Sequence, residues 1–258
     1  MKPLKILLTN ETGCFEPGII ALAKVLSIRH RVCIVAPLSG KTDIGHALTI
    51  DSPIRVEQFF ALSKAKIYGV NGTPCDCVGL ALDKLLKSKP DLIISGIGTK
   101  NSCGEVIYTS GITSSAILGT IYGVKSIALS ADIQDTKKES EYLSIARAFS
   151  KKLELLIKKI TTNITLNVNY PAKFQSGKIK ETHLTMGTLN SKYTHEVNPF
   201  GIEFYWHKNI GMNYPLSALD QKGDLYWLKK GFATVTPLKY DLTSDVGLKV
   251  LEGSKIKI

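Results

Sequence analysis

The chain has 258 residues, 44 % of them hydrophobic, and a formal net charge of +11. This composition suits one domain, or two small ones, with a sizeable core. No apolar run approaches the roughly 18 residues of a membrane-spanning helix, so we expect no membrane partner. Only four of the 33 basic residues are arginine, the side chain that nucleic-acid readers favour, and we therefore expect no nucleic-acid partner.

The N-terminus and the cysteines indicate the compartment. The first apolar stretch is interrupted by Thr9, Asn10 and Glu11, which makes it too short for a secretory signal, so we interpret it as a strand. The five cysteines are an odd number without a secretion signal and predict free thiols instead of a disulfide framework. Both observations favour a cytoplasmic protein.

The N-terminal part of the chain alternates apolar strands with helices. The run KILLT at 5–9 is typical of a strand buried on both faces, Pro17 opens a helix with one broad apolar face, and VCIVA at 32–36 is a second buried strand. Strand, helix and strand in this order form a βαβ unit, which implies a parallel sheet. Further short strands are expected at 55–60 and 65–70.

Helix signals punctuate the middle of the chain. Thr73 is a helix cap, Pro74 suits the first helical position, and Asp76 lies in the first turn of a helix that should run to about Lys87. Later buried strands are predicted at 91–97, 125–130 and 166–169, the last as the final strand of the main sheet, with helices at 110–122 and 139–160.

The texture of the sequence changes after Pro171. Glycine, proline, asparagine and aromatic residues become more frequent, and short extended segments are predicted at 178–185, 202–206 and 232–236. We expect a single domain over residues 1–258, with an α/β core at 1–171 and an appended β-rich part at 172–258.

Three polar loops follow strands of the predicted parallel sheet, at 10–16, 37–46 and 98–110. All three leave the carboxyl ends of their strands. Ligands bind at that edge in open α/β sheets. The pattern therefore places the candidate site among these loops.

The motifs in and around these loops resemble those of a known family. They are LLTNETG, APLSGKTDIGHALT, GTPCDCV, SGIGTKNSCGEVIYTSG, LNVNYP, NPFGIEFYW and GDLYWLKKGFATVTPLKYDLT. They cover essentially the whole chain in order, and together they are similar to the signatures of the SurE family. The resemblance implies a Rossmann-like, doubly wound sheet with a C-terminal hairpin and oligomerisation extension. It also implies a nucleoside monophosphate phosphatase that uses Mg²⁺ or Mn²⁺ and forms a homodimer or homotetramer.

The resemblance assigns the family's metal-ligand positions, and this chain departs from most of them. Two adjacent aspartates, a serine and an asparagine of the family fall on Glu11, Thr12, Thr42 (or Ser39, if the loop is shifted) and Gly98. Hard divalent ions prefer oxygen ligands, and charged ones most. Because one carboxylate remains and Gly98 has no side chain, we expect weak or absent metal binding.

The anion-binding part of the family pattern is better preserved. Ser110 and Gly111 stand at a predicted helix start, where backbone N–H groups and the helix dipole attract phosphate. Lys41 replaces the usual arginine, and Asn101 lies in the fourth motif. The resemblance thus implies Ser110, Gly111, Lys41 and Asn101 as phosphate ligands.

Two functions remain open at this stage. The first is a metal-dependent 5′-nucleotidase, with Glu11, Asn10 and Ser110 as catalytic candidates. The second is a non-catalytic relative that binds a nucleotide or phosphate at the same place; a scaffold that only assembles through its C-terminal part is less favoured. Asn10, Thr12 and Ser110 are also residue types that turns and helix caps favour, and their presence alone does not select a function.

Overall fold

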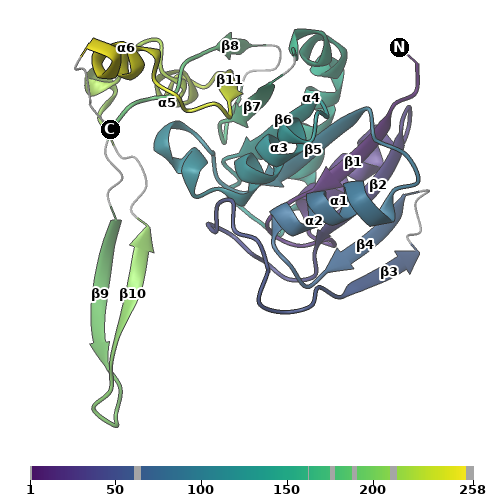
Figure 1. The fold of residues 1–258 in the computed structure, drawn as a ribbon, viewed down its shortest axis with the longest axis horizontal. Coiled ribbons are helices and arrows are strands. Elements are labelled where there is room, and N and C mark those ends of the chain that lie inside the picture. The colour runs from purple at the N-terminus through teal and green to yellow at the C-terminus, as the bar shows by residue number, and fades with distance from the viewer. Residues whose placement is uncertain are drawn as a thin grey trace.

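A computed structural model describes residues 2–60, 65–161, 163–174, 178–187, 191–209 and 214–253. Its centre is a nine-stranded sheet in the order β3-β4-β2-β1-β5-β6-β7-β11-β8 (Figure 1). The six strands from β4 to β7 in this order run parallel, and β3 and β11 pair antiparallel with their neighbours β4 and β7. The strands are β1 (Lys5–Thr9), β2 (Arg31–Pro37), β3 (Val56–Phe60), β4 (Lys66–Val70), β5 (Leu92–Gly98), β6 (Ser126–Ala131), β7 (Ile164–Tyr170), β8 (Ile179–Glu181) and β11 (Ala233–Lys239).

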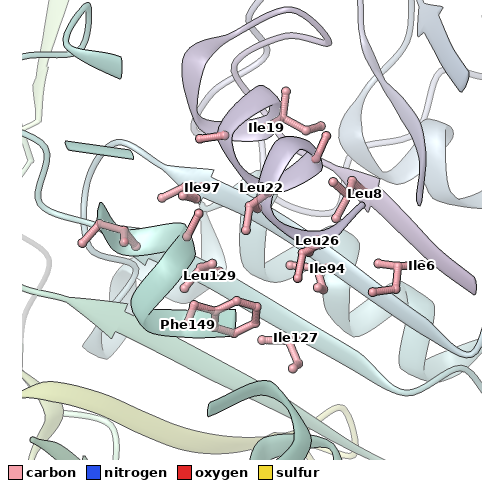
Figure 2. Close-up of a cluster of buried hydrophobic side chains, with 14 of the residues drawn as sticks. Ile6, Leu8, Ile19, Leu22, Leu26, Ile94, Ile97, Ile127, Leu129 and Phe149 are labelled. Carbon is pink, nitrogen blue, oxygen red and sulfur yellow. The ribbon is translucent and has the colours of Figure 1, made fainter. Parts of the chain in front are cut away.

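Helices cover both faces of the sheet, as a doubly wound fold requires. On one face α1 (Pro17–Leu26) packs beside α4 (Glu139–Lys159), and on the other α2 (Pro74–Leu80) packs beside α3 (Gly111–Ile121). The larger core lies under α1 and α4. Figure 2 shows Leu22 and Phe149 from these helices over Ile94, Ile127 and Leu129 of the sheet. The predicted mostly parallel α/β fold is confirmed.

The helix that begins at Thr73 follows the expected start but not the expected end. Thr73 Oγ1 accepts from the backbone N–H of Asp76, and Asp76 accepts from the N–H of Thr73, so both orphan donors are satisfied by a capping box. The second half of the helix, Ala81–Leu85, is wound as a π-helix, and the chain is extended from Leu86. The helix therefore ends two residues before the predicted Lys87.

The main sheet does not end at the strand predicted for 166–169. That strand, β7, pairs with β11 from near the C-terminus, and β11 pairs with β8. The segments predicted as extended at 178–185 and 232–236 thus extend the sheet that the α/β core begins. The predicted division into 1–171 and 172–258 stays a prediction.

A long hairpin stands apart from the sheet. It consists of β9 (Ser191–Val197) and β10 (Glu203–Asn209), which pair only with each other among the described residues, and Figure 1 shows it projecting from the body. Two helices flank the last sheet strand, α5 (Asp224–Lys229) and α6 (Asp245–Gly253). Among the described helices, none has the length and apolar character needed to cross a membrane.

Candidate functional site

The three polar loops meet at the carboxyl edge of the sheet, as the topology predicts. The backbone N–H of Lys41 donates to the carbonyl of Glu11 at 2.7 Å, and the N–H of Gly45 donates to the carbonyl of Thr109, also at 2.7 Å. The second loop is thereby tied to the first and to the third. The two contacts join residues about 30 and about 60 positions apart in the chain, so the three loops form one surface.

Asn10 holds the first loop in shape. Its side chain is fully buried, its amide donates to the Gly13 carbonyl at 2.8 Å, and its carbonyl accepts from the Gly13 N–H at 3.1 Å. Gly13 has a φ of 139°, a conformation that a side chain would strain. The Asn10 amide also donates to the Thr12 hydroxyl at 2.9 Å. Asn10 and Thr12 therefore build a turn, the structural alternative that their residue types allowed.

Glu11 reaches from this turn to the start of α3. Its Oε2 accepts from the backbone N–H of Gly111 at 2.7 Å. Burial raises the pKa of the Glu11 carboxyl to about 7, with a smaller contribution from the nearby charge of Asp43, while hydrogen bonds from the Gly111 and Ile112 backbones act in the opposite direction. The carboxylate is thus desolvated and held at the positive end of a helix.

Ser110 caps α3 and belongs to a cluster of buried hydroxyls. Its Oγ accepts from the Thr113 N–H at 3.4 Å and lies 2.9 Å from Ser102 Oγ, which lies 3.2 Å from Ser130 Oγ. The sequence reading did not assign Ser102 or Ser130. The signal available for Ser102 was its place in the fourth motif, where it replaces the family's usual residue.

Two asparagines of β7 bind the backbone of Ser102, a member of this cluster. The Asn167 and Asn169 amides donate to the Ser102 carbonyl at 2.6 and 3.1 Å, and Asn169 Oδ1 accepts from the Ser102 N–H at 2.8 Å. Both side chains are fully buried. In the sequence they appear as polar residues at alternate positions of the motif LNVNYP, the pattern of one strand face pointing to a polar environment. The motif resembles a family signature, but its local pattern does not assign the two asparagines to the site.

Three further residues predicted for the site, Lys41, Thr42 and Asn101, make no side-chain contact with the start of α3 among the described hydrogen bonds. The side chains of Lys41 and Thr42 are exposed, and Asn101 is half-buried. The structure thus brings together Asn10, Glu11, Thr12, Ser110 and Gly111.

The donors at the predicted metal positions do not fit a preformed divalent site. The Glu11 carboxylate is engaged by α3, and the position that a Cβ of Gly98 would take is 2.9 Å from Ser130 Oγ and 3.1 Å from Ile112 Cγ1. The described residues contain no group of three or more His, Cys, Asp or Glu side chains able to hold a metal ion. Magnesium and calcium sites need several oxygen ligands in one place, and this set supplies one carboxylate.

The C-terminal part of the chain holds the third loop from outside. Asp224 is fully buried and accepts from the N–H of Gly104 at 3.0 Å and from the N–H and hydroxyl of Thr185 at 2.9 and 2.8 Å. The N–H of Gly187 also donates to Glu105. These contacts couple α5 and the segment that follows β8 to the loop that carries Ser102. Nothing in the local sequence pattern indicated them, because the partners lie about 40 to 120 positions apart.

Comparison with known proteins agrees with this architecture along the whole chain. The family model described as "Survival protein SurE" matches residues 6–194. The chain is 35 % identical to "5′-nucleotidase SurE" of Thermoanaerobacter sp. (strain X514), over 99 % of this chain and 100 % of that one. It is 37 % identical to "5′-nucleotidase SurE" of Clostridium beijerinckii, over 93 % and 94 % of the two chains. The crystal structure of the SurE protein from Aquifex aeolicus superposes with a TM-score of 0.75 at 32 % identity, covering 96 % of this chain and 99 % of that one. The chain belongs to the SurE family.

Proposed function

We propose that this protein is a hydrolase that removes phosphate from nucleoside monophosphates, with a weakened affinity for divalent metal. One observation carries the proposal. The first turn of α3 and the turn Asn10–Gly13 face each other across the Glu11–Gly111 contact at the ligand-binding edge of the sheet. The curated relatives that match over the full length are described as 5′-nucleotidases.

The residues support the phosphate-binding part of this function. Ser110 and Gly111 lead an eleven-residue helix, whose first N–H groups and dipole stabilise negative charge. The buried hydroxyls of Ser102 and Ser130 fix Ser110 by hydrogen bonds. A phosphoryl group held there would take the place that the Glu11 carboxylate occupies in this structure. Lys41 and Asn101 are proposed to contact the substrate from the rim.

The experiment is phosphate release from a panel of 5′- and 3′-nucleoside monophosphates and an aryl phosphate, with Mg²⁺, with Mn²⁺ and with chelator. We expect hydrolysis that depends on added metal and falls by at least about tenfold in kcat/KM in Ser110→Ala, the usual scale for removing one positioned polar group. Ser126→Ala is the matched control, because Ser126 is equally buried and hydrogen-bonded but lies at the other end of the sheet. Equal losses in both variants would refute the assigned role of Ser110.

A second function is favoured by one observation, the misfit of the metal donors. In this alternative the protein binds a nucleotide or phosphate without cleaving it. Calorimetry with the same nucleotides separates the two: saturable binding with no phosphate release under any metal condition would support the alternative and contradict the hydrolase.

Two further parts of the proposal concern the cell and the assembly. All five cysteines are free, which suits a reducing compartment and supports a cytoplasmic location. The projecting hairpin exposes Tyr205 and Trp206 by 61 % and 60 %, and we infer that it contributes to a homodimer or homotetramer.

A further inference from the structure

The N-terminal donors of α3 are already occupied by the protein itself. The N–H of Gly111 donates to Glu11 Oε2 at 2.7 Å, across 100 positions of sequence. The N–H of Thr113 is directed to Ser110 Oγ. Two of the first three N–H groups of the helix, the groups that would bind an anion, thus have partners within the chain.

The contact leaves no space for a second anion. A Cβ placed on Gly111 would lie 3.0 Å from Glu11 Oε2 and 3.1 Å from Glu11 Cβ, with Pro74 Cγ also 3.0 Å away. A phosphate oxygen at hydrogen-bonding distance from the Gly111 N–H would overlap the Glu11 carboxylate, and the two negative charges would repel each other at that distance.

The length of the Glu11 side chain is what makes the contact. An aspartate is shorter by one C–C bond, about 1.5 Å. Withdrawing the carboxylate by that amount from a backbone fixed by the Lys41 N–H and by Asn10 would lengthen the 2.7 Å contact beyond hydrogen-bonding range. A glutamate at position 11 therefore reaches the Gly111 N–H, whereas an aspartate would leave this N–H free.

We propose that Glu11 is an internal competitor for the phosphate site, so that its side chain must rotate away from α3 before a phosphate group can bind there. The proposal rests on the function inferred above only in naming phosphate as the ligand. Because the first loop is held by its own hydrogen bonds, the movement is confined to the Glu11 side chain. Residue 11 thereby sets the affinity of the site for anions independently of catalysis.

The experiment measures binding of inorganic phosphate by calorimetry, in chelator, to the wild-type protein, Glu11→Asp and Glu11→Ala. We expect both variants to bind phosphate at least roughly tenfold more tightly than wild type, about 1.4 kcal/mol. Glu16→Asp and Glu16→Ala are the matched controls, because Glu16 belongs to the same loop, is exposed, and makes no side-chain hydrogen bond to α3. They should retain the wild-type affinity.

A second measurement, the melting temperature with and without phosphate, remains informative if the variants are less stable than wild type. Phosphate bound only to the folded state raises the free energy of unfolding by RT ln(1 + L/Kd), where L is the phosphate concentration. At one phosphate concentration, the phosphate-induced rise in melting temperature should therefore be larger in both Glu11 variants even if they melt earlier. Equal affinity in wild type and both variants would overturn the proposal, as would an equal gain in the Glu16 controls, which would indicate adventitious binding to surface lysines. Tight phosphate binding by the variants together with no nucleotide hydrolysis by any protein would leave the competitor role intact and contradict the proposed hydrolase.

Discussion

At position 11, one side chain couples the charge of the site to the stability of the fold. The Glu11 carboxyl has a pKa of about 7, raised from 4.5 mainly by burial and further by Asp43. Between about pH 4.5 and pH 7, the Glu11 carboxyl is therefore protonated in the folded protein and ionised in the unfolded chain. This contribution to the free energy of unfolding is fully present below about pH 4.5 and is lost as the pH rises through about 7.

The first prediction compares wild type with Glu11→Gln, which cannot ionise. Between about pH 4.5 and pH 8 the wild-type free energy of unfolding should fall by up to about 3 kcal/mol relative to that of the variant, since one pKa unit corresponds to about 1.4 kcal/mol. Urea unfolding across this range measures the difference. Parallel pH profiles for the two proteins would contradict the assignment of this proton to Glu11.

Gly98 shows what the sequence alone could not decide at the level of a residue. The resemblance located the position and the missing asparagine, but the local space depends on Ser130 and Ile112, which belong to other elements. Gly98→Asn should destabilise the protein by about 1–3 kcal/mol, the usual cost of overpacking. Adding Ile112→Thr should recover part of that loss, as measured by urea unfolding. A fully stable Gly98→Asn would show that the neighbours move aside.

At the scale of elements, local pattern predicted the strands and helices better than their partners. The sequence predicted a strand at each of the six adjacent parallel strands from β4 to β7, and Thr73 with Asp76 predicted the start of α2. The same signals gave no indication that β11 pairs with β7, because that pairing joins segments about 70 positions apart and depends on packing. The same holds for the site. Asn10, Glu11 and Ser110 lie in loops that the sequence identifies. Asn167 and Asp224 reach the site only through contacts between segments that are distant in the sequence.

Asp224 connects α5 to the third loop and to Thr185, and this connection can be tested. It satisfies donors from Gly104, Thr185 and Leu225, so Asp224→Ala leaves several buried N–H groups without partners and should cost about 2–4 kcal/mol of stability. Hydrogen exchange should accelerate most in the third loop, around 101–108. Asp220→Ala is the control, because Asp220 is exposed and accepts only within its own turn. Uniform acceleration over the whole sheet would contradict a local anchoring role.

At the scale of the whole molecule, the projecting hairpin β9–β10 exposes several large apolar side chains. Tyr205, Trp206 and Phe200 are 61 %, 60 % and 87 % exposed, and exposed apolar patches of this kind mark protein interfaces. The sequence predicted one of the two strands but not that β9 and β10 would pair only with each other among the described residues, because strand partners depend on tertiary packing.

We therefore expect the protein to sediment as a dimer or tetramer. The double variant Tyr205→Asp/Trp206→Asp should shift sedimentation toward the monomer, since it places charges on the apolar surface. Lys208→Asp, on the same exposed strand, changes charge without removing apolar area and should leave the assembly unchanged. A wild-type monomer over the accessible concentration range would contradict the inferred assembly.

We propose that this SurE-family protein keeps the phosphate-binding residues of its site and has a weakened metal-binding set. The most direct measurement is Mn²⁺-dependent phosphate release from nucleoside monophosphates by wild type and by Glu11→Asp/Thr12→Asp, which restores two adjacent carboxylates without crowding Gly98. We expect slow release by wild type and at least about tenfold faster release by the double variant, which corresponds to about 1.4 kcal/mol of barrier. Fast release by wild type that the double variant does not exceed would contradict this proposal.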